Sequence, residues 1–554
     1  MAPGRVGSDG PITRSAGVPS SQPFELMRES HLLHDIVAQA AIRWPDKPAL
    51  SHGERVLNYT QLDRHVCAFA SGLRALGLAR SERVAVFLEK RLETVVSCFG
   101  AARAGGVFVP LNPALRPQQV RHILRDSAAS VLVTSALRLG PLLSLLADCP
   151  SLRHVVLVDE PGATGDTSIV RYDDMLATTT LAGHRVIDGD MAAILYTSGS
   201  TGLPKGVVLS HRNMLVGAKS VAQYLGNRDD DVLLAALPLS FDAGFSQLTT
   251  AFHSGARVVL LNHVLAQDVV KTMAREKVTG LTAVPPLWIQ LSQLQWPATV
   301  AEHLRYFANT GGRMPRETLR RLRALAPRSE PFLMYGLTEA FRATYLPPAE
   351  VDRRPDSIGM AIPNSEVLVL RPDGTPCGDD EPGELVQRGP LVAMGYWNDA
   401  ERTADRFRPL PPAAGRRDRA IMVPEIAVFS GDIVRRDADG FLYFIGRLDD
   451  MIKTSGYRVS PTEVEEVLYA CAGIGECAVF GVEDATLGQV VVAVVAAAPD
   501  SDPVDVDALL RECRVHLPPY MVPREVLVRG GPLPRNPNGK IDRKALAAEL
   551  KESP

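Results

Sequence analysis

Apolar and polar residues alternate with two different periods along the chain from about residue 31. Helical spacing marks 32–43, 59–76, 91–104 and 117–127, and short β-branched runs lie between and after these segments at 83–87, 107–111, 130–134 and 154–158. Strands that alternate with helices favour a parallel sheet with helical crossovers. The pattern therefore predicts a doubly wound α/β unit.

The same rhythm continues beyond residue 191. A strand is expected at 191–196, a helix from His211, and further strands at 232–237, 257–261, 280–284 and 305–308, which a second doubly wound unit explains most simply. From about 360 to 446 the pattern changes to short strands with turn residues, such as 367–370 followed by Pro372-Asp373-Gly374. This change predicts a β-rich subdomain.

The length of 554 residues exceeds what one hydrophobic core supports, so at least two domains are expected. Residues 1–25 are rich in Gly, Ser and Pro and predict a disordered tail. The fold class expected is α/β: a large N-terminal domain over 26–446, a hinge at 447–449, and a small mobile α+β C-terminal domain over 450–554.

Composition and charge exclude several kinds of partner. The 60 basic and 63 acidic residues are spread along the chain and indicate no nucleic-acid surface. The longest apolar run, 490–499, has about half the length that a bilayer requires, so no membrane span is expected. The seven cysteines are odd in number and lack C-x-x-C pairs, which argues for a reducing, cytoplasmic location without a disulfide framework or structural zinc.

The most specific candidate chemistry follows the expected strand at 191–196. Hydroxyl groups, glycine backbone N–H groups and one lysine can together hold a polyphosphate. The nucleotide-binding P-loop is excluded, because Pro204 precedes the lysine and a glycine follows it where Ser or Thr would ligate magnesium. A flexible surface turn is disfavoured by the number and order of these residues. They are Thr197, Ser198, Gly199, Ser200, Thr201, Gly202, Lys205 and Gly206.

Three later stretches carry further candidate residues. Thr338 and Glu339 end an apolar run and suit a phosphate and a magnesium ion, or a helix N-terminus. Asp432 could accept from both hydroxyls of a ribose, with Arg447 reaching the same sugar, or it could be a turn residue. Lys540 could place a positive charge between a carboxylate and a phosphate, or lie on a surface turn.

Together these stretches resemble the adenylate-forming superfamily, which comprises acyl-CoA synthetases, peptide-synthetase adenylation domains and luciferases. The resemblance covers about residues 32–546. It implies that a carboxylic acid and Mg-ATP give an acyl-adenylate and pyrophosphate, after which a thiol attacks the adenylate and releases AMP. It also implies two placements of the small C-terminal domain, one for each half-reaction.

The resemblance implies a role for each candidate residue. The loop from Thr197 to Gly206 would bind the β- and γ-phosphates, Thr338 the α-phosphate and Glu339 the magnesium ion. Gly311, Gly312 and Tyr335 would flank the adenine, and Asp432 and Arg447 would hold the ribose. Asp449 would be the hinge, Lys540 the adenylation lysine, and Gly456 a neighbour of the pantetheine channel, with Arg458 among the cofactor-binding residues.

The thiol and the acid are indicated less directly. The stretch 454–461 looks more like acyl-CoA ligases, so coenzyme A is the expected thiol. However, Phe241 stands where those ligases usually have histidine, and Phe241-Asp242 resembles amino-acid-activating domains, where the aspartate meets the substrate's amino group. Asp242 is therefore expected either to pair with an ammonium group or to cap the following helix. Phe241, Trp288 and Gly336 are expected to line the acid pocket.

The function expected is an AMP-forming carboxylic acid–CoA ligase that uses ATP, Mg²⁺ and coenzyme A. An amino-acid adenylating enzyme that loads a separate carrier protein is the main alternative. A non-catalytic nucleotide-binding protein is a remote one. The identity of the acid stays open, since a pocket shape cannot be derived from one sequence.

Overall fold

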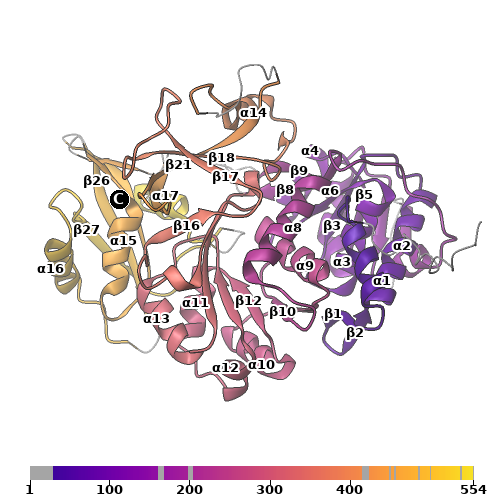
Figure 1. Ribbon diagram of the computed structural model, residues 1–554, viewed down its shortest axis with the longest axis horizontal. Coiled ribbons are helices and arrows are strands. Elements are labelled where there is room, and N and C mark those ends of the chain that lie inside the picture. Colours follow the sequence, from indigo (N-terminus) through magenta and orange to yellow (C-terminus); the bar gives the residue numbers. More distant parts are fainter. Residues whose placement is uncertain are drawn as a thin grey trace, which may run out of the picture.

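The computed structural model describes residues 29–159, 168–197, 204–414, 423–447, 451–454, 457–484, 487–498, 501–536 and 540–552. These residues form three β-sheets with helices packed on their faces (Figure 1). The predicted tail at 1–25 lies outside the described residues, as do Asp449, Gly456 and the loop residues Ser198, Gly199, Ser200, Thr201 and Gly202.

The first sheet has eight strands in the order β19-β9-β8-β4-β3-β5-β6-β7. Its middle strands pair in parallel, which confirms the predicted crossovers. β8 and β9 are antiparallel, however, so the phosphate-loop segment joins two strands of a hairpin; the sequence pattern predicted only the first. The strands are β3 (Arg83–Phe87), β4 (Val107–Pro110), β5 (Ala129–Thr134), β6 (His154–Leu157), β7 (Ser168–Arg171), β8 (Met191–Thr197), β9 (Lys205–Ser210) and β19 (Gly395–Tyr396).

The second sheet has a parallel half, in the order β14-β13-β12-β10-β11-β1. The N-terminal hairpin of β1 and β2 joins this sheet through β11, a long-range pairing that the sequence pattern did not predict. The strands of this half are β1 (Pro48–His52), β2 (Arg55–Asn58), β10 (Val232–Ala235), β11 (Arg257–Leu260), β12 (Gly280–Ala283), β13 (Tyr306–Asn309) and β14 (Glu330–Tyr335).

The predicted β-rich segment continues this second sheet with antiparallel strands. β15 pairs with β14, and the following strands extend the sheet to β17. The hairpin expected near residue 372 is confirmed by the pairing of β17 with β18. The strands are β15 (Thr344–Leu346), β16 (Ser357–Ala361), β17 (Glu366–Leu370), β18 (Gly383–Arg388), β20 (Phe407–Pro409), β21 (Ile426–Arg436) and β22 (Leu442–Arg447).

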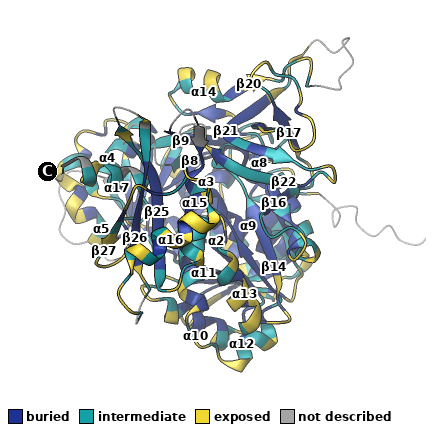
Figure 2. Ribbon diagram, turned by 90° about the vertical axis from the view of Figure 1, so that its left-hand side faces the viewer, coloured by how far each residue is buried: buried dark blue, intermediate teal, exposed yellow. Residues whose placement is uncertain are grey.

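Four helices form a layer shared by the two sheets. α3 and α9 are buried along nearly their whole length, as helices between two sheets must be, and one hydrophobic cluster joins them to both sheets. The outer helices alternate buried and exposed faces (Figure 2). No helix in the described ranges has both the length and the apolar character needed to cross a membrane. The shared layer contains α2 (Tyr59–Ala75), α3 (Leu92–Ala104), α8 (His211–Leu225) and α9 (Asp242–Ser254).

The remaining main helices cover the outer faces of the sheets. Two of them, α1 and α4, lie within three residues of the predicted helical segments at each end, and so do α2 and α3 of the shared layer. These outer helices are α1 (Asp35–Arg43), α4 (Pro117–Asp126), α10 (Ala266–Glu276), α11 (Pro285–Ser292), α12 (Ala298–His303), α13 (Arg316–Leu325) and α14 (Ala400–Arg406).

The C-terminal part is built around a third sheet of five strands with its own hydrophobic clusters. It lies at one end of the molecule, against the carboxyl edge of the second sheet (Figure 1). Its elements are β23 (Ile452–Thr454), β24 (Tyr457–Val459), α15 (Pro461–Ala470), β25 (Ile474–Asp484), β26 (Gly488–Ala497), α16 (Val506–His516), β27 (Glu525–Arg529) and α17 (Arg543–Glu552).

Candidate active site

A cleft of about 2950 Å³ separates the C-terminal part from the rest of the chain. Its floor lies at the carboxyl ends of β12, β13 and β14, where open α/β sheets bind ligands. Thirteen of the predicted site residues line it, although they come from segments as far apart as the first sheet and the C-terminus. They are Thr197, Lys205, Phe241, Asp242, Gly311, Gly312, Tyr335, Gly336, Thr338, Glu339, Asp432, Arg447 and Lys540.

Lys205, Glu339 and Tyr396 form one connected group in this cleft. Lys205 Nζ lies 3.2 Å from Glu339 Oε1 and 2.9 Å from the Tyr396 hydroxyl, which in turn donates to Glu339 Oε1 at 2.6 Å. Burial would raise the pKa of Glu339, but the charge of Lys205 and the hydrogen bond from Tyr396 outweigh it, so the pKa is lowered. Glu339 is therefore an ionised oxygen donor of the kind that magnesium prefers.

Thr197 is the last residue of β8 and stands opposite Lys205 in the β8–β9 ladder. Its hydroxyl oxygen is buried and has no hydrogen-bond partner among the described residues. Buried hydroxyl groups are nearly always paired, so this one is suited to a ligand oxygen. The arrangement fits a phosphate held at the mouth of the hairpin, beside the lysine.

Asp432 and Arg447 are cross-strand partners in β21 and β22. Arg447 Nε lies 3.3 Å from Asp432 Oδ1, and the Tyr335 hydroxyl donates to Oδ2. Oδ1 is buried and accepts no hydrogen bond from the described residues, which leaves it available to a sugar hydroxyl. Burial raises the pKa of Asp432, although Arg447 and Tyr335 oppose the shift.

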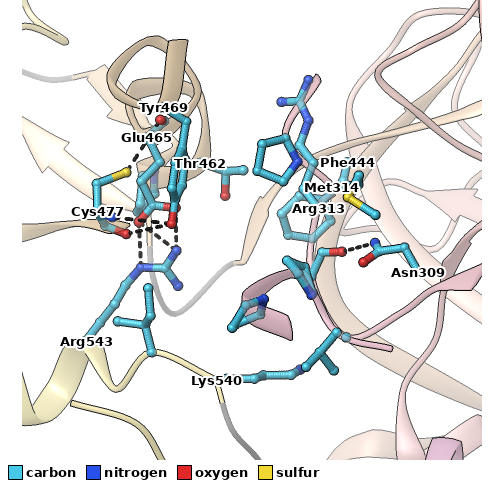
Figure 3. Close-up of a pocket in the computed structure, with 18 of the residues that line it drawn as sticks. Asn309, Arg313, Met314, Phe444, Thr462, Glu465, Tyr469, Cys477, Lys540 and Arg543 are labelled. Atoms are coloured by element: carbon cyan, nitrogen blue, oxygen red, sulfur yellow. Dashed lines mark hydrogen bonds and ion pairs between the residues drawn. The ribbon is translucent and has the colours of Figure 1, made fainter. Parts of the chain in front are cut away.

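Lys540 reaches from the C-terminal part into the cleft beside Gly311. A Cβ on Gly311 would lie 3.4 Å from Lys540 Cε, so the lysine side chain is in contact with this position, and the backbone φ of +77° there favours glycine. Figure 3 shows Lys540 at the base of the cleft, between the wall of Asn309 and the wall of Arg543. The pKa of Lys540 is lowered, chiefly by desolvation inside the cleft, although the side chain stays exposed to the cleft space; Asp242 opposes the shift and Arg447 adds to it.

Ion pairs join the two walls of the cleft near the start of α13. Glu466 of α15 pairs with Arg313 and lies 3.5 Å from Arg316 Nε. Both arginines also pair with Asp356, so one carboxylate on each side of the cleft shares the same two cations. The placement that brings Lys540 to Gly311 is therefore held partly by charge.

Asp242 is the first residue of α9, after the N-cap Phe241, and its side chain is occupied within the fold. Arg342 Nη1 donates to Asp242 Oδ2 at 2.9 Å, and the Thr338 hydroxyl lies 3.2 Å from Oδ1. Both charged side chains are buried. The expectation that Asp242 awaits a substrate ammonium group is therefore weakened, because a fixed arginine already neutralises it.

Trp288 does not line the cleft. It is fully buried in a hydrophobic cluster on α11, and its indole Nε1 donates to the carbonyl oxygen of Ala308. The prediction of a pocket residue was wrong, because a tryptophan after two prolines in an apolar run is equally suited to the core. Gly206 packs within β9, where a Cβ would collide with Ile194. Arg458 lies in β24, and its side chain is outside the described part.

Sequence reasoning missed two residues of the cleft. Tyr396 belongs to a strand of only two residues, and nothing in the sequence pattern distinguishes it from an aromatic residue in an ordinary turn. Arg342 carries a detectable signal: it is the single charge in Ala340-Phe341-Arg342-Ala343, and a lone charge in an apolar run indicates a buried ion pair. Its partner could not be identified from the sequence.

The comparison with family models decides the family. The model of the AMP-binding enzyme matches residues 37–397, and the model of its C-terminal domain matches residues 463–540. The chain belongs to the AMP-binding enzyme family. The predicted superfamily is thereby confirmed, and the fold predicted for it agrees with solved structures of similar proteins.

Relatives of this AMP-binding enzyme include proteins with two kinds of acceptor. The long-chain-fatty-acid–CoA ligase of Salmonella typhimurium is 29% identical over 570 residues, covering 96% of this chain and 97% of its own. The L-proline–[L-prolyl-carrier protein] ligase of Pseudomonas fluorescens is 30% identical and covers 94% and 99%. Among solved structures, the anthranilate CoA ligase AuaEII with anthranoyl-AMP has a TM-score of 0.83 and 25% identity, covering 94% and 97%.

Proposed function

We propose that this protein is an AMP-forming carboxylic acid–CoA ligase. In the first half-reaction, a carboxylate oxygen of the acid attacks the α-phosphorus of ATP, and the bond from that phosphorus to the bridging oxygen breaks to release pyrophosphate. In the second, the thiol sulfur of coenzyme A attacks the acyl carbon, the thiol proton is lost, and AMP leaves. The products are an acyl-CoA thioester and AMP.

The single observation that supports this function best is the position of Lys540. It enters the cleft beside Gly311, in the cavity that Lys205, Glu339 and Asp432 also line. A positive charge between two anions lowers the energy of their approach and of the charge that develops during attack. Lys540 is thus suited to stabilise the adenylation transition state.

The other residues of the cleft would bind and orient the nucleotide and the magnesium ion. Lys205 and Thr197 would contact the terminal phosphates, and Asp432 Oδ1, which accepts no hydrogen bond from the described residues, would accept from a ribose hydroxyl. Glu339 would be a ligand of Mg²⁺, which neutralises phosphate charge when bound. One carboxylate would hold only part of the ion's coordination, so phosphate oxygens and water would supply the remaining ligands.

Mass spectrometry of products from a panel of acids with ATP, with and without coenzyme A, tests the proposal. A ligase gives AMP and pyrophosphate with its acid, and the acyl-CoA thioester only when coenzyme A is present. The pairing of Asp242 with Arg342 favours this function over amino-acid activation. Adenylate without any thioester to coenzyme A would indicate a carrier-protein acceptor, and absence of AMP with every acid would refute catalysis.

A further inference from the structure

A small chamber of about 20 Å³ adjoins the inner end of the cleft. It shares the walls Ala243, Met334 and Arg342 with the cleft, so the two cavities are neighbours across these residues. The remaining walls come from α8, α9 and the strands β10, β12 and β13. This position suits the chamber to receive the far end of an acid bound in the cleft.

Only a few atoms fit in the chamber. Its floor is the ring of Tyr306, which is buried and packed so closely that a Cβ on Gly280 would collide with it. Asn227 Nδ2 donates to the Tyr306 hydroxyl at 3.1 Å and fixes the ring from behind. A volume near 20 Å³ holds about one water molecule, and so about one or two non-hydrogen atoms. A long alkyl chain cannot occupy it.

Two residues that line the chamber each carry a polar atom that makes no hydrogen bond within the described part of the chain. Arg342 is 2% exposed and Gln247 is 6% exposed, yet Arg342 Nε and Gln247 Oε1 make no hydrogen bond with the described residues. The other end of the Gln247 amide is held, since Nε2 donates to the Gly244 carbonyl oxygen at 3.1 Å. Buried polar groups left without partners are costly, and a ligand that satisfies them gains affinity and selectivity.

The charges around the chamber balance one another. Arg342 pairs with Asp242 at 2.9 Å, and the pair is net neutral. An ammonium group in the chamber would lie beside Arg342 and meet repulsion. A carboxylate there would lose its water, and Arg342 already shares its charge with Asp242, so the carboxylate gains little attraction to offset that cost. A hydroxyl group carries no charge and avoids both costs, and it can accept from Arg342 Nε and donate to Gln247 Oε1.

We propose that the acid is a short carboxylic acid with a neutral hydroxyl group, and that Arg342 and Gln247 recognise this hydroxyl. The inference rests on the proposed function, because it concerns the acid that the ligase activates. The Arg342–Asp242 pair makes the chamber selective against charged groups, and Tyr306 limits the length of the chain.

Pyrophosphate exchange with a matched panel tests the specificity of the unmodified protein. The probes are 2-, 3- and 4-hydroxybutyrate, butyrate, succinate, 4-aminobutyrate and palmitate. One hydroxybutyrate should exceed all four other acids in kcat/KM by at least about tenfold. A preference for palmitate, succinate or aminobutyrate, or equal rates with butyrate, would overturn this inference and leave the proposed function intact. No exchange with any of these seven acids would overturn this inference as well, and the broader panel described above would then decide the proposed function.

A variant pair tests the recognising residue. Gln247→Leu removes the acceptor and should bring the ratio of kcat/KM for hydroxybutyrate over butyrate toward one. Thr249→Val on the same helix is the control: Thr249 is also buried but does not line the chamber, so the ratio should stay unchanged. An unchanged ratio in a folded Gln247→Leu protein would overturn the assignment, and the acid panel decides the substrate class even if that variant does not fold.

Discussion

Asp432 Oδ1 lies 3.3 Å from Arg447 Nε across two neighbouring strands, and it is buried without a hydrogen-bond donor from the described residues. Fifteen residues of sequence separate the two, but strand pairing places them directly opposite each other. An acceptor held beside a guanidinium and shielded from water is prepared for a diol that can donate to it.

This pairing predicts a pH dependence of nucleotide binding. The pKa of Asp432 is raised by burial, so the ionised form that accepts from a sugar is lost at a higher pH than for a free aspartate. AMP affinity should therefore fall as pH decreases through the raised pKa. Titration calorimetry from neutral to mildly acidic pH measures this. Asp432→Asn should bind AMP about tenfold more weakly with a flatter profile, and an unchanged profile would contradict the role.

Replacing Lys540 should separate the two half-reactions. Lys540→Ala should slow adenylate formation by about 10²-fold or more, because the charge between the reacting anions is lost. Thiol transfer from a supplied acyl-adenylate should remain within about twofold, as quenched-flow assays of each step would show. The pKa of Lys540 is lowered, so its charge is lost at a lower pH than that of an ordinary lysine. As pH rises, wild-type adenylation should therefore begin to decline earlier, and Lys540→Arg should move that decline to higher pH. Equal loss in both steps would refute the assignment.

Removing the Glu466 carboxylate should weaken the contact that holds the C-terminal part, and with it Lys540, against the rest of the cleft. Glu466→Gln breaks the pairs with Arg313 and Arg316, which, as partly exposed ion pairs, contribute about 0.2–1 kcal/mol each. Pyrophosphate exchange should fall two- to fivefold, and thiol transfer should not. Glu317→Gln is the control, because Glu317 pairs with Arg320 and Arg321 of its own helix. Similar effects of both variants would argue against a role for the Glu466 ion pairs in holding the C-terminal part.

The Tyr396 hydroxyl should lower the concentration of Mg-ATP that the enzyme requires, because it donates a hydrogen bond to Glu339. Tyr396→Phe keeps the ring under Lys205, whose Nζ lies 4.2 Å from the ring centroid, but removes the donor to Glu339. A hydrogen bond to a charged group is worth about 1.5–3 kcal/mol, so the Mg-ATP requirement should rise about tenfold or more. Pyrophosphate exchange over a magnesium series measures it. Tyr443→Phe, which removes a similar bond to Asp437, should leave it unchanged.

Trp288 should affect stability and leave the choice of acid unchanged. Trp288→Ala opens a cavity beneath α11 and should cost about 3–5 kcal/mol of unfolding free energy. Trp296→Ala, at a partly buried position, should cost less. Chemical denaturation gives both values, and the acid panel should keep its order in any Trp288 variant that folds. A changed order would restore Trp288 to the pocket.

Much of the fold could be predicted because side-chain periodicity is a local property. The strand expected at 83–87 is found over Arg83–Phe87, and the helices of the N-terminal half lie within three residues of their expected ends. The pairing of β1 with β11 could not be predicted, since strands far apart in the sequence find their partners through packing. The pairing of β8 with β9 was missed for another reason, because the apolar run after the loop was not interpreted as a strand.

The candidate site divides in the same way. Motif residues such as Lys205, Glu339 and Lys540 could be identified from the sequence, because phosphate and transition-state chemistry require particular residue types in a particular order. Trp288 could not be placed, because one apolar run suits a pocket and a core equally.

What the sequence determined alone is the alternation of strands and helices and the types of residue that could bind a nucleotide and an acid, since both are local properties of the chain. What only the tertiary structure decided is which charges meet. Asp242 and Arg342 are separated by 100 residues and are paired at 2.9 Å. The energy of a buried charge depends on its neighbours in space, and these exist only once the sheets have packed.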